Sequence, residues 1–210
     1  MKELLEIYDL NEKLIKVEER EKFYSEIKEE FASKGKITSQ VKTVRILLLN
    51  SKGRIYLQKR SKLKNENPGL HDKTVGGHIP KGCTWKMGVI RECSEELGFP
   101  AAVLSPEEFD EAVRSIDLNV IGLFKKIDYI SNFESMRLTK KGGKFIQPFM
   151  SAFYMGYYDG SIRFADGEAS GIEVFSLEEL KDDIKNNPNG FTEDIKFMIK
   201  EYEKFLIPLK

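Results

Sequence analysis

Apolar residues recur along this chain at two spacings, and each spacing predicts a different element. Residues 41–49, VKTVRILLL, are rich in β-branched and apolar side chains and predict a buried strand. A turn at 50–53 leads into a second strand at 54–60. Between 21 and 32 large apolar side chains recur every fourth position, which predicts an amphipathic helix. The same reasoning predicts the remaining elements: strands at 4–10, 119–130, 145–158, 162–164 and 172–175, and helices at 105–113, 177–184 and 192–206.

These elements predict an α/β (α+β) fold in which a mixed β-sheet carries helices on its faces. A length of 210 residues suits one domain, or one domain with an extension. We interpret residues 1–36, a short strand and a helix, as an N-terminal extension packed on a domain of 37–210.

Charge and composition narrow the classes of partner. The chain has 34 basic and 34 acidic residues, so no global field favours nucleic acid or an anionic membrane. No apolar run is long enough to span a bilayer, and the N-terminus is too acidic for a signal peptide. We therefore expect a cytoplasmic protein. Two cysteines do not make a disulfide framework, and Cys93 is expected to pack as a small apolar residue.

The most informative stretch is 76–99, GGHIPKGCTWKMGVIRECSEELGF. Glu92, Glu95 and Glu96 stand at i, i+3 and i+4, which places them within an arc of about 100° on one helix face. Such carboxylates repel one another unless a cation lies over them, and their oxygens suit Mg²⁺ or Mn²⁺. A solvated acidic face is the alternative. The neighbouring arc can face a core and holds Val89, Ile90, Cys93 and Leu97.

The flanks of this helix favour a functional loop–helix–loop unit. Gly76 and Gly77 allow the backbone to approach a ligand closely. Thr84 is placed to cap the N-terminus of the helix, and Gly98 to end it.

In this unit the sequence resembles the Nudix box of the Nudix hydrolase (MutT-like) family. The box residues stand at the family's spacing, except that Cys83 occupies the place of a glutamate; the matching residues are Gly77, Arg91, Glu92, Cys93, Glu95, Glu96, Gly98 and Phe99. The resemblance implies the Nudix α/β/α sandwich, a mixed β-sheet with helices on both faces. Residues 57–61, 68–70, 76–78 and 168–180 resemble the branch related to isopentenyl-diphosphate isomerase.

The resemblance also implies a metal site for Mg²⁺ (or Mn²⁺). By the family pattern Glu92 and Glu96 are the central ligands, Glu95 is a further ligand, and the carbonyl of Gly76 completes the shell. Arg91 would orient or neutralise these acids. Its alternative is an ordinary surface ion pair.

A base and a phosphate clamp complete the implied chemistry. Glu95 and Glu168 are the two candidates for the general base. Arg60, with Lys59 or Lys64, is a candidate to bind phosphate, although strand alternation lets only one of Lys59 and Arg60 reach the site directly.

The leading hypothesis is a Mg²⁺-dependent hydrolase of a diphosphate linkage in a nucleoside diphosphate joined to a second group, or in a related small molecule. The alternatives are an isomerase of isopentenyl diphosphate and a non-catalytic protein that keeps the fold. The related isomerases use a cysteine before the box, and 72–78 contains none. His78 is expected to make a structural hydrogen bond rather than to bind metal. The sequence leaves the substrate, and the existence of a homodimer, open.

Overall fold

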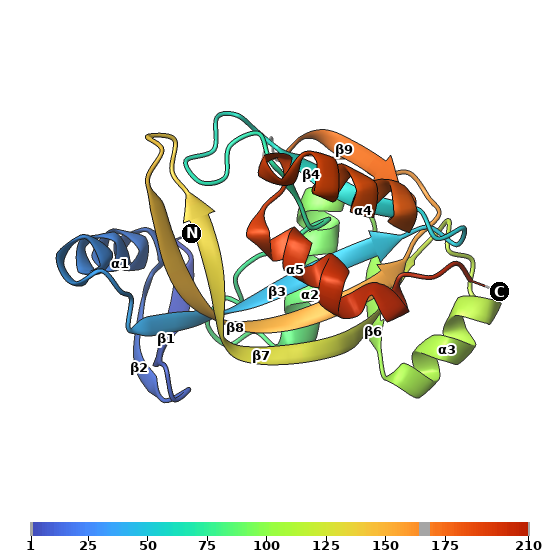
Figure 1. The fold of residues 1–210 in the computed structure, drawn as a ribbon. Helices are drawn as coiled ribbons and strands as arrows, with labels where there is room; N and C mark the ends of the chain where they lie inside the picture. The colour runs from blue at the N-terminus through green and yellow to red at the C-terminus, as the bar shows by residue number, and fades with distance from the viewer. Residues whose placement is uncertain (1, 164–168, 210) are drawn as a thin grey trace.

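The protein is described by a computed structural model that covers residues 2–163 and 169–209. One mixed β-sheet organises the fold (Figure 1), and its main path has the strand order β2-β1-β3-β8-β7-β6. A branch leaves β3 through β4, which also pairs with β5 and β9. The strands are β1 (Leu4–Asp9), β2 (Leu14–Glu19), β3 (Ser39–Leu49), β4 (Ile55–Arg60), β5 (His71–Asp72), β6 (Ala101–Leu104), β7 (Gly122–Leu138), β8 (Lys144–Tyr157) and β9 (Ala169–Phe175).

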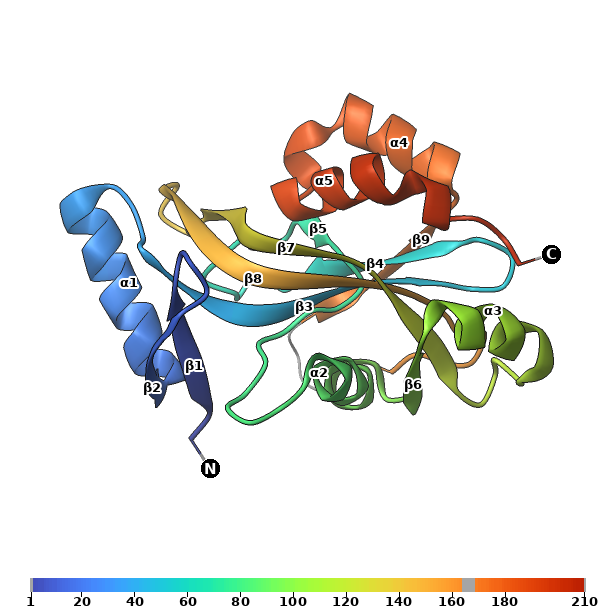
Figure 2. The same cartoon turned by 90° about the horizontal axis from the view of Figure 1, so that it is seen from below.

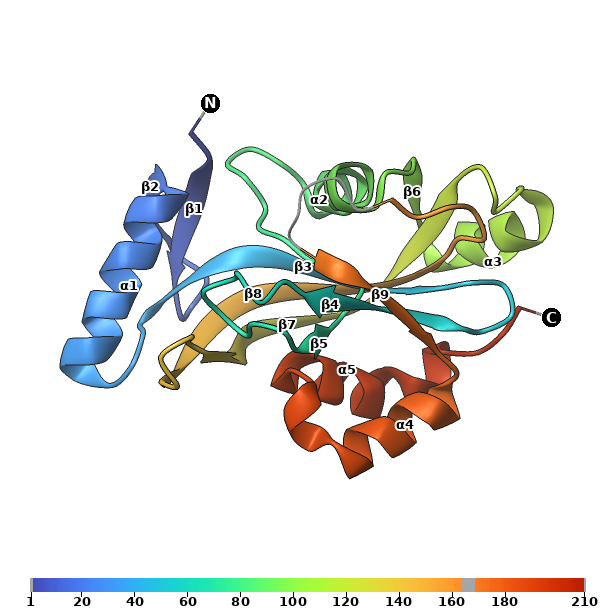
Figure 3. The same cartoon turned by 90° about the horizontal axis from the view of Figure 1, so that it is seen from above.

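Helices cover both faces of this sheet. Figure 2 shows α2 on one face and α4 with α5 on the other, and Figure 3 shows the same layers from the opposite side. Helix α1 lies beside β1 and β2 at one end of the sheet, and α3 lies near β6 at the other. The α-helices are α1 (Arg20–Lys34), α2 (Trp85–Glu92), α3 (Pro106–Ser115), α4 (Leu177–Asn186) and α5 (Glu193–Tyr202). The described residues also form short helical turns: η1 (Cys93–Leu97), η2 (Pro188–Gly190) and η3 (Glu203–Phe205).

Alternation along β3 separates two cores. Leu47 and Leu49 face α4 and α5, while Val44, Ile46 and Leu48 face α2. Successive side chains of a strand point to opposite faces, so one apolar run serves both layers. Parallel pairing of β3 with β8 at the centre of the sheet explains why this strand is apolar on both sides.

Local signals account for the ends of the helices. The Thr84 hydroxyl accepts a hydrogen bond from the Met87 amide at 3.2 Å, as an N-cap does. Ser105 and Glu108 form a reciprocal capping box at the start of α3. Gly98 follows η1 at φ 74°, a left-handed conformation that favours glycine.

The N-terminal segment continues the sheet. Residue Ile7 of β1 pairs with Val41 of β3, and Leu5 and Ile7 share a buried cluster with Phe23 and Ile27 of α1. The sequence pattern missed β2, whose residues are largely exposed and so lack a clear apolar alternation. The boundary between 36 and 37 stays a prediction.

Other sequence-based boundaries need correction. Ile162 and Arg163 do not form the expected strand, and Phe164 lies outside the described residues. The last long helix ends at Tyr202 and continues as a 3₁₀ turn. Ile90 is 41% exposed, so it does not face the core as expected. Within 2–163 and 169–209, we find no helix that combines the length and the apolar character of a membrane span.

Candidate active site

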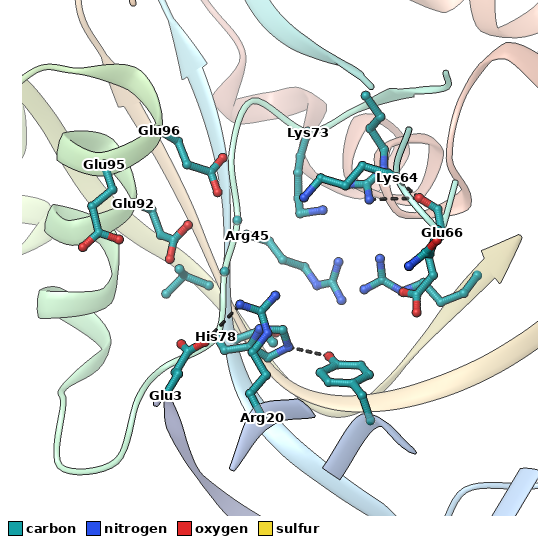
Figure 4. Close-up of a pocket in the computed structure, with 18 of the residues that line it drawn as sticks. Glu3, Arg20, Arg45, Lys64, Glu66, Lys73, His78, Glu92, Glu95 and Glu96 are labelled. Atoms are coloured by element: carbon teal, nitrogen blue, oxygen red, sulfur yellow. Dashed lines mark hydrogen bonds and ion pairs between the residues drawn. The ribbon is translucent and has the colours of Figure 1, made fainter. Parts of the chain in front are cut away.

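A polar cavity of about 500 Å³ opens between α2, α1 and the strands β3, β4 and β7. Figure 4 shows acidic side chains of the α2 segment on one side and basic side chains on the other. Two groups of its lining residues recur below. We call Glu92, Glu95 and Glu96 the acid wall, and we call Arg45, Arg60, Lys73 and Arg137 the basic wall.

The three glutamates of the acid wall differ in exposure. Glu92 is buried, Glu96 is half-buried and Glu95 is exposed. The sequence expectation of one shared arc assumed a regular α-helix, but Cys93–Leu97 forms a π-helical turn. A π-turn holds more residues than an α-turn, so Glu95 lies farther round the axis from Glu92 than an i, i+3 residue of an α-helix.

Gly77 makes room for the carboxylate of Glu92. A Cβ at position 77 would lie 2.1 Å from Glu92 Oε1 and 2.5 Å from Oε2. Any side chain there would displace the carboxylate. Glycine at this position therefore lets Glu92 lie against the backbone of the loop that carries Gly76, the predicted carbonyl ligand.

Glu95 and Arg91 form a two-contact ion pair along the helix. Arg91 Nε and Nη2 donate to the two carboxylate oxygens at 3.2 and 3.1 Å. Both side chains are substantially exposed, so the pair contributes little to the free energy of unfolding. It does hold Arg91 against one of the acids that it was predicted to orient.

The acid wall has the donor chemistry of a site for a hard divalent cation. Carboxylate oxygens suit Mg²⁺ and Mn²⁺, and three carboxylates so close together favour a cation between them. As the described side chains are placed, no three His, Cys, Asp or Glu groups converge on one point. The carboxylates therefore have suitable donor atoms for such an ion. To bind one ion together, their side chains must rotate toward one another.

The basic wall is more buried than the acid wall. Arg45 is 1% exposed and Lys73 is 7% exposed. Two carboxylates, Asp72 and Asp194, lie behind these cations: Lys73 Nζ donates to Asp72 at 3.1 Å, and Arg45 Nη1 donates to Asp194. Among the described residues that line the cavity neither aspartate occurs, so the carboxylates support the cations from the protein side.

Burial and neighbouring charges together set the pKa values in this wall. Burial lowers the pKa of the Lys73 ammonium although Asp72 lies beside it. For Asp194 burial alone would raise the pKa, but Arg45, Arg137 and Lys73 outweigh burial and bring the pKa below its ordinary value. Despite burial, Lys73 and Arg60 likewise bring the pKa of Asp72 below its ordinary value, so both aspartates are charged partners of the basic wall.

Helix α1 contributes a further side of the cavity. Arg20, Tyr24 and Lys28 lie four residues apart, and all three line it. The Tyr24 hydroxyl lies 2.5 Å from His78 Nε2, which confirms the structural hydrogen bond expected of His78. Burial, followed by the nearby Arg20, holds the pKa of His78 well below its usual range, so this ring is neutral.

The predicted phosphate-binding residues separate as strand alternation suggests. Arg60 and Lys64 line the cavity. Lys59 does not occur among the described lining residues, and its ammonium lies 3.3 Å from His71 Nε2 instead. Glu168, the predicted downstream base, lies outside the described residues.

Sequence reasoning missed much of the basic side of the cavity. The signal for Arg45 was present, because this charge lies between apolar residues on both sides, in residues 44–49 of β3. Lys73, Arg137 and the α1 residues carried no local signal, since the tertiary fold alone brings them to the cavity.

The two cysteines occupy different surroundings. Cys93 is fully buried in the core under α2, which confirms its expected packing, and burial raises the pKa of its thiol. Cys83 is half-buried in the turn before α2, where its amide donates to the carbonyl of Pro80 at 3.0 Å.

Comparison with known proteins points to one family. The NUDIX domain family matches residues 39–195. An isopentenyl-diphosphate Delta-isomerase of Serratia proteamaculans is 24% identical over 147 residues, which span 70% of this chain and 68% of that protein. An uncharacterised Nudix hydrolase of Pseudomonas aeruginosa is 41% identical over 59 residues, which span 28% of this chain and 35% of that protein.

Solved structures show the same fold. The crystal structure of DR0079 from Deinococcus radiodurans covers 94% of this chain and 98% of its own, with a TM-score of 0.63 at 19% identity. The chain belongs to the NUDIX family, because the family match spans most of its length. The predicted α/β Nudix fold is confirmed, and so is the prediction of a Nudix hydrolase enzyme at the level of the family.

Proposed function

We propose that this protein is a Mg²⁺- or Mn²⁺-dependent hydrolase that cleaves a diphosphate linkage in a nucleoside diphosphate joined to a second group, or in a related small molecule. The observation that carries the proposal is the pairing of an acid wall with a basic wall across one cavity. Hydrolysis of a diphosphate requires both a place for hard cations and positive groups for the remaining phosphate charge.

In this proposal the acid wall binds the metal. Glu92 and Glu96 hold the metal, with Glu95 as a further ligand and the carbonyl of Gly76 beside them. A bound divalent cation supplies neutralisation of phosphate charge and a lowered pKa of water. Arg91 orients Glu95, which it contacts through two hydrogen bonds.

Two other sets of residues complete the chemistry. Arg60 and Lys64 bind phosphate oxygens, and Arg60 is suited to this because its guanidinium is already oriented by two hydrogen bonds to the carbonyl of Glu66. Glu95 or Glu168 removes the proton from the attacking water. Replacing the true base by glutamine lowers turnover by about 10²- to 10⁴-fold.

The test is a metal-dependent hydrolysis screen. Nucleoside diphosphate sugars, dinucleoside polyphosphates, coenzymes and isoprenoid diphosphates are incubated with Mg²⁺, with Mn²⁺ or with EDTA, and released products are separated by chromatography. We expect hydrolysis of at least one diphosphate that EDTA stops and Glu96→Gln reduces strongly. Glu111→Gln, an exposed glutamate on α3, is the matched control. A wild-type protein that leaves every diphosphate intact contradicts the proposal and favours a binding protein.

A second candidate is an isomerase of isopentenyl diphosphate, which the length of the similarity to the Serratia enzyme favours. The absence of a cysteine from residues 72–78 counts against it. In the same screen isomerisation moves a double bond and leaves the diphosphate intact, whereas hydrolysis releases phosphate. The product from isopentenyl diphosphate therefore separates the two candidates.

A further inference from the structure

A row of polar side chains crosses the sheet beneath the cavity. Arg45 of β3, Ser151 and Gln147 of β8, and Ser135 of β7 are each at most 1% exposed. Strand pairing sets Ser151 opposite Thr43 and Gln147 opposite Ser135, so these positions are neighbours in register. Burying a polar side chain costs free energy unless it is hydrogen-bonded. A row of such side chains inside the protein therefore indicates a binding site rather than ordinary core packing.

Arg137 ends this row with an unsatisfied donor. Its Nε atom is buried, and no hydrogen-bond partner for it exists among residues 2–163 and 169–209. The side chain lines the cavity, and its guanidinium carbon lies 5.3 Å from the centre of the Phe149 ring. The Arg45 guanidinium carbon lies 5.3 Å from the same ring. Two positively charged guanidinium groups thus lie near the same aromatic ring beside the cavity.

The charge of the basic wall exceeds that of its carboxylates. Four cations, Arg45, Arg60, Lys73 and Arg137, stand with two aspartates. Glu66 does not alter this excess, because it forms an ion pair with Lys28 at 3.3 Å. The acid wall stands on the other side of the cavity (Figure 4). Once a divalent cation neutralises that wall, the basic wall needs another anion.

The rest of the lining gives little support to an apolar ligand. Its described members include one aliphatic side chain, Val44, and two rings, Tyr24 and His78, which contact each other edge to face. An alkyl tail or an uncharged base in this part of the cavity would cover buried cations without hydrogen-bonding them, which is unfavourable.

We propose that Arg45, Lys73 and Arg137 form a buried site for a second anionic group of the substrate, a phosphoryl group remote from the diphosphate that is cleaved. The proposal rests on the proposed function, since it assigns the acid wall to the metal and the cleaved diphosphate. Guanidinium groups bind phosphate with two parallel hydrogen bonds, and the unsatisfied Nε of Arg137 supplies one such donor. The substrate class is therefore a diphosphate compound with at least one additional phosphate.

Metal-free binding of inorganic phosphate tests the site itself. We expect calorimetry in EDTA to show one phosphate bound per chain of wild type. Arg137→Met should lower this affinity by about tenfold or more, because it removes charged hydrogen bonds. Arg114→Met, which changes an exposed arginine of α3, is the matched control and should bind as wild type does. No binding by wild type, or equal affinity in Arg137→Met, overturns the proposal.

A second variant, Arg137→Lys, keeps the test valid if Arg137→Met does not fold. Arg137→Lys keeps the charge but loses the two-pronged geometry, so its affinity for phosphate should fall by a smaller but measurable factor. Unchanged affinity in a folded Arg137→Lys protein contradicts a role for the guanidinium.

Simultaneous binding tests whether this anion site is separate from the site of the cleaved diphosphate. With Mg²⁺ and pyrophosphate saturating the acid wall, inorganic phosphate should still bind to wild type. Mutual exclusion would show that Arg45, Lys73 and Arg137, like Arg60, serve the cleaved diphosphate, and it would overturn the second-anion proposal. Failure of the proposed function has a different signature: Mg²⁺ with pyrophosphate does not bind and no diphosphate is hydrolysed, while metal-free phosphate binding persists.

Discussion

At the scale of single residues, the acid wall depends on a residue that has no side chain. Gly77 leaves the space in which the Glu92 carboxylate lies, and Glu92 is the most buried of the three glutamates. Cys83 occupies the position of a family glutamate, but it does not occur among the described residues that line the cavity. Both positions lie in the segment between β5 and α2.

Gly77→Ala should damage the site more than the fold. The new Cβ would displace the Glu92 carboxylate, which is the far end of a flexible side chain, so the cost to folding is small. We expect the rise in melting temperature on adding Mg²⁺ to be largely lost, whereas a native metal site at a hundredfold excess over Kd stabilises by about 2.7 kcal/mol. Differential scanning calorimetry with and without metal measures this. Gly171→Ala, where a Cβ has open space, should keep the full shift.

Cys83→Glu should maintain or raise hydrolysis. Cys83 is only half-buried at the turn before α2, so a glutamate there can direct its carboxylate to solvent. The added carboxylate restores the family's usual partner for the box arginine. Steady-state kinetics on the best substrate of the screen measures the effect. Loss of activity in a folded variant would give the thiol a positive role and return the isomerase to consideration.

At the scale of elements, β3 and α5 are joined through buried charges. Asp194 lies in the first turn of α5, where Arg45 donates to it and Ser135 Oγ donates at 2.7 Å. Thr192, the N-cap of the same helix, donates to Asp72 at 2.8 Å. The start of α5 therefore positions two cations of the basic wall, although α5 itself does not line the cavity in the described part of the chain.

Asp194→Asn should destabilise the fold and flatten its pH dependence. Removing one partner of a buried ion pair costs about 3–5 kcal/mol of unfolding free energy. The pKa of Asp194 is depressed, so its contribution is present above the unfolded pKa of about 3.9 and is lost as the pH falls toward the folded pKa. Urea unfolding between pH 7 and pH 3 should show wild type losing stability on acidification and the variant losing less. Glu193→Gln, at the exposed neighbouring position, should behave as wild type does.

At the scale of the whole molecule, the cavity is closed by a segment outside the family match. The match begins at residue 39, yet Arg20, Tyr24 and Lys28 of α1 line the cavity. Pairing of β1 with β3 and the hydrogen bond of Tyr24 to His78 attach this segment to the domain. The N-terminal segment is thus part of the site and not only a cover for the sheet.

Tyr24→Phe should weaken this attachment. The change removes a hydroxyl that lies 2.5 Å from His78 Nε2 and accepts from Gln147 Nε2 at 3.3 Å. Leaving buried polar groups without a partner costs about 1–3 kcal/mol. Thermal unfolding should show a lower melting temperature, and amide hydrogen exchange should rise first in α1. Unchanged exchange in α1 would mean that its apolar cluster alone holds the helix.

Much of the fold follows from local patterns. Strand β3, the helix start at Thr84 and its end at Gly98, and the capping of α3 all follow from short stretches of sequence. Local patterns failed where side chains are mostly exposed, as in β2, and where a regular helix was assumed, as in the π-turn that separates Glu95 from Glu92.

The sequence by itself determined the family and the acid wall, because the box residues lie within one loop and one helix and their spacing carries the information. Apart from Arg60, which the sequence already suggested, only the tertiary structure decided the basic wall. Its residues come from β3, β4, the loop after β5, and β7, up to 92 positions apart between Arg45 and Arg137. Strand pairing and the burial of Asp72 and Asp194 bring them together, and neither effect is visible in any short stretch of the chain.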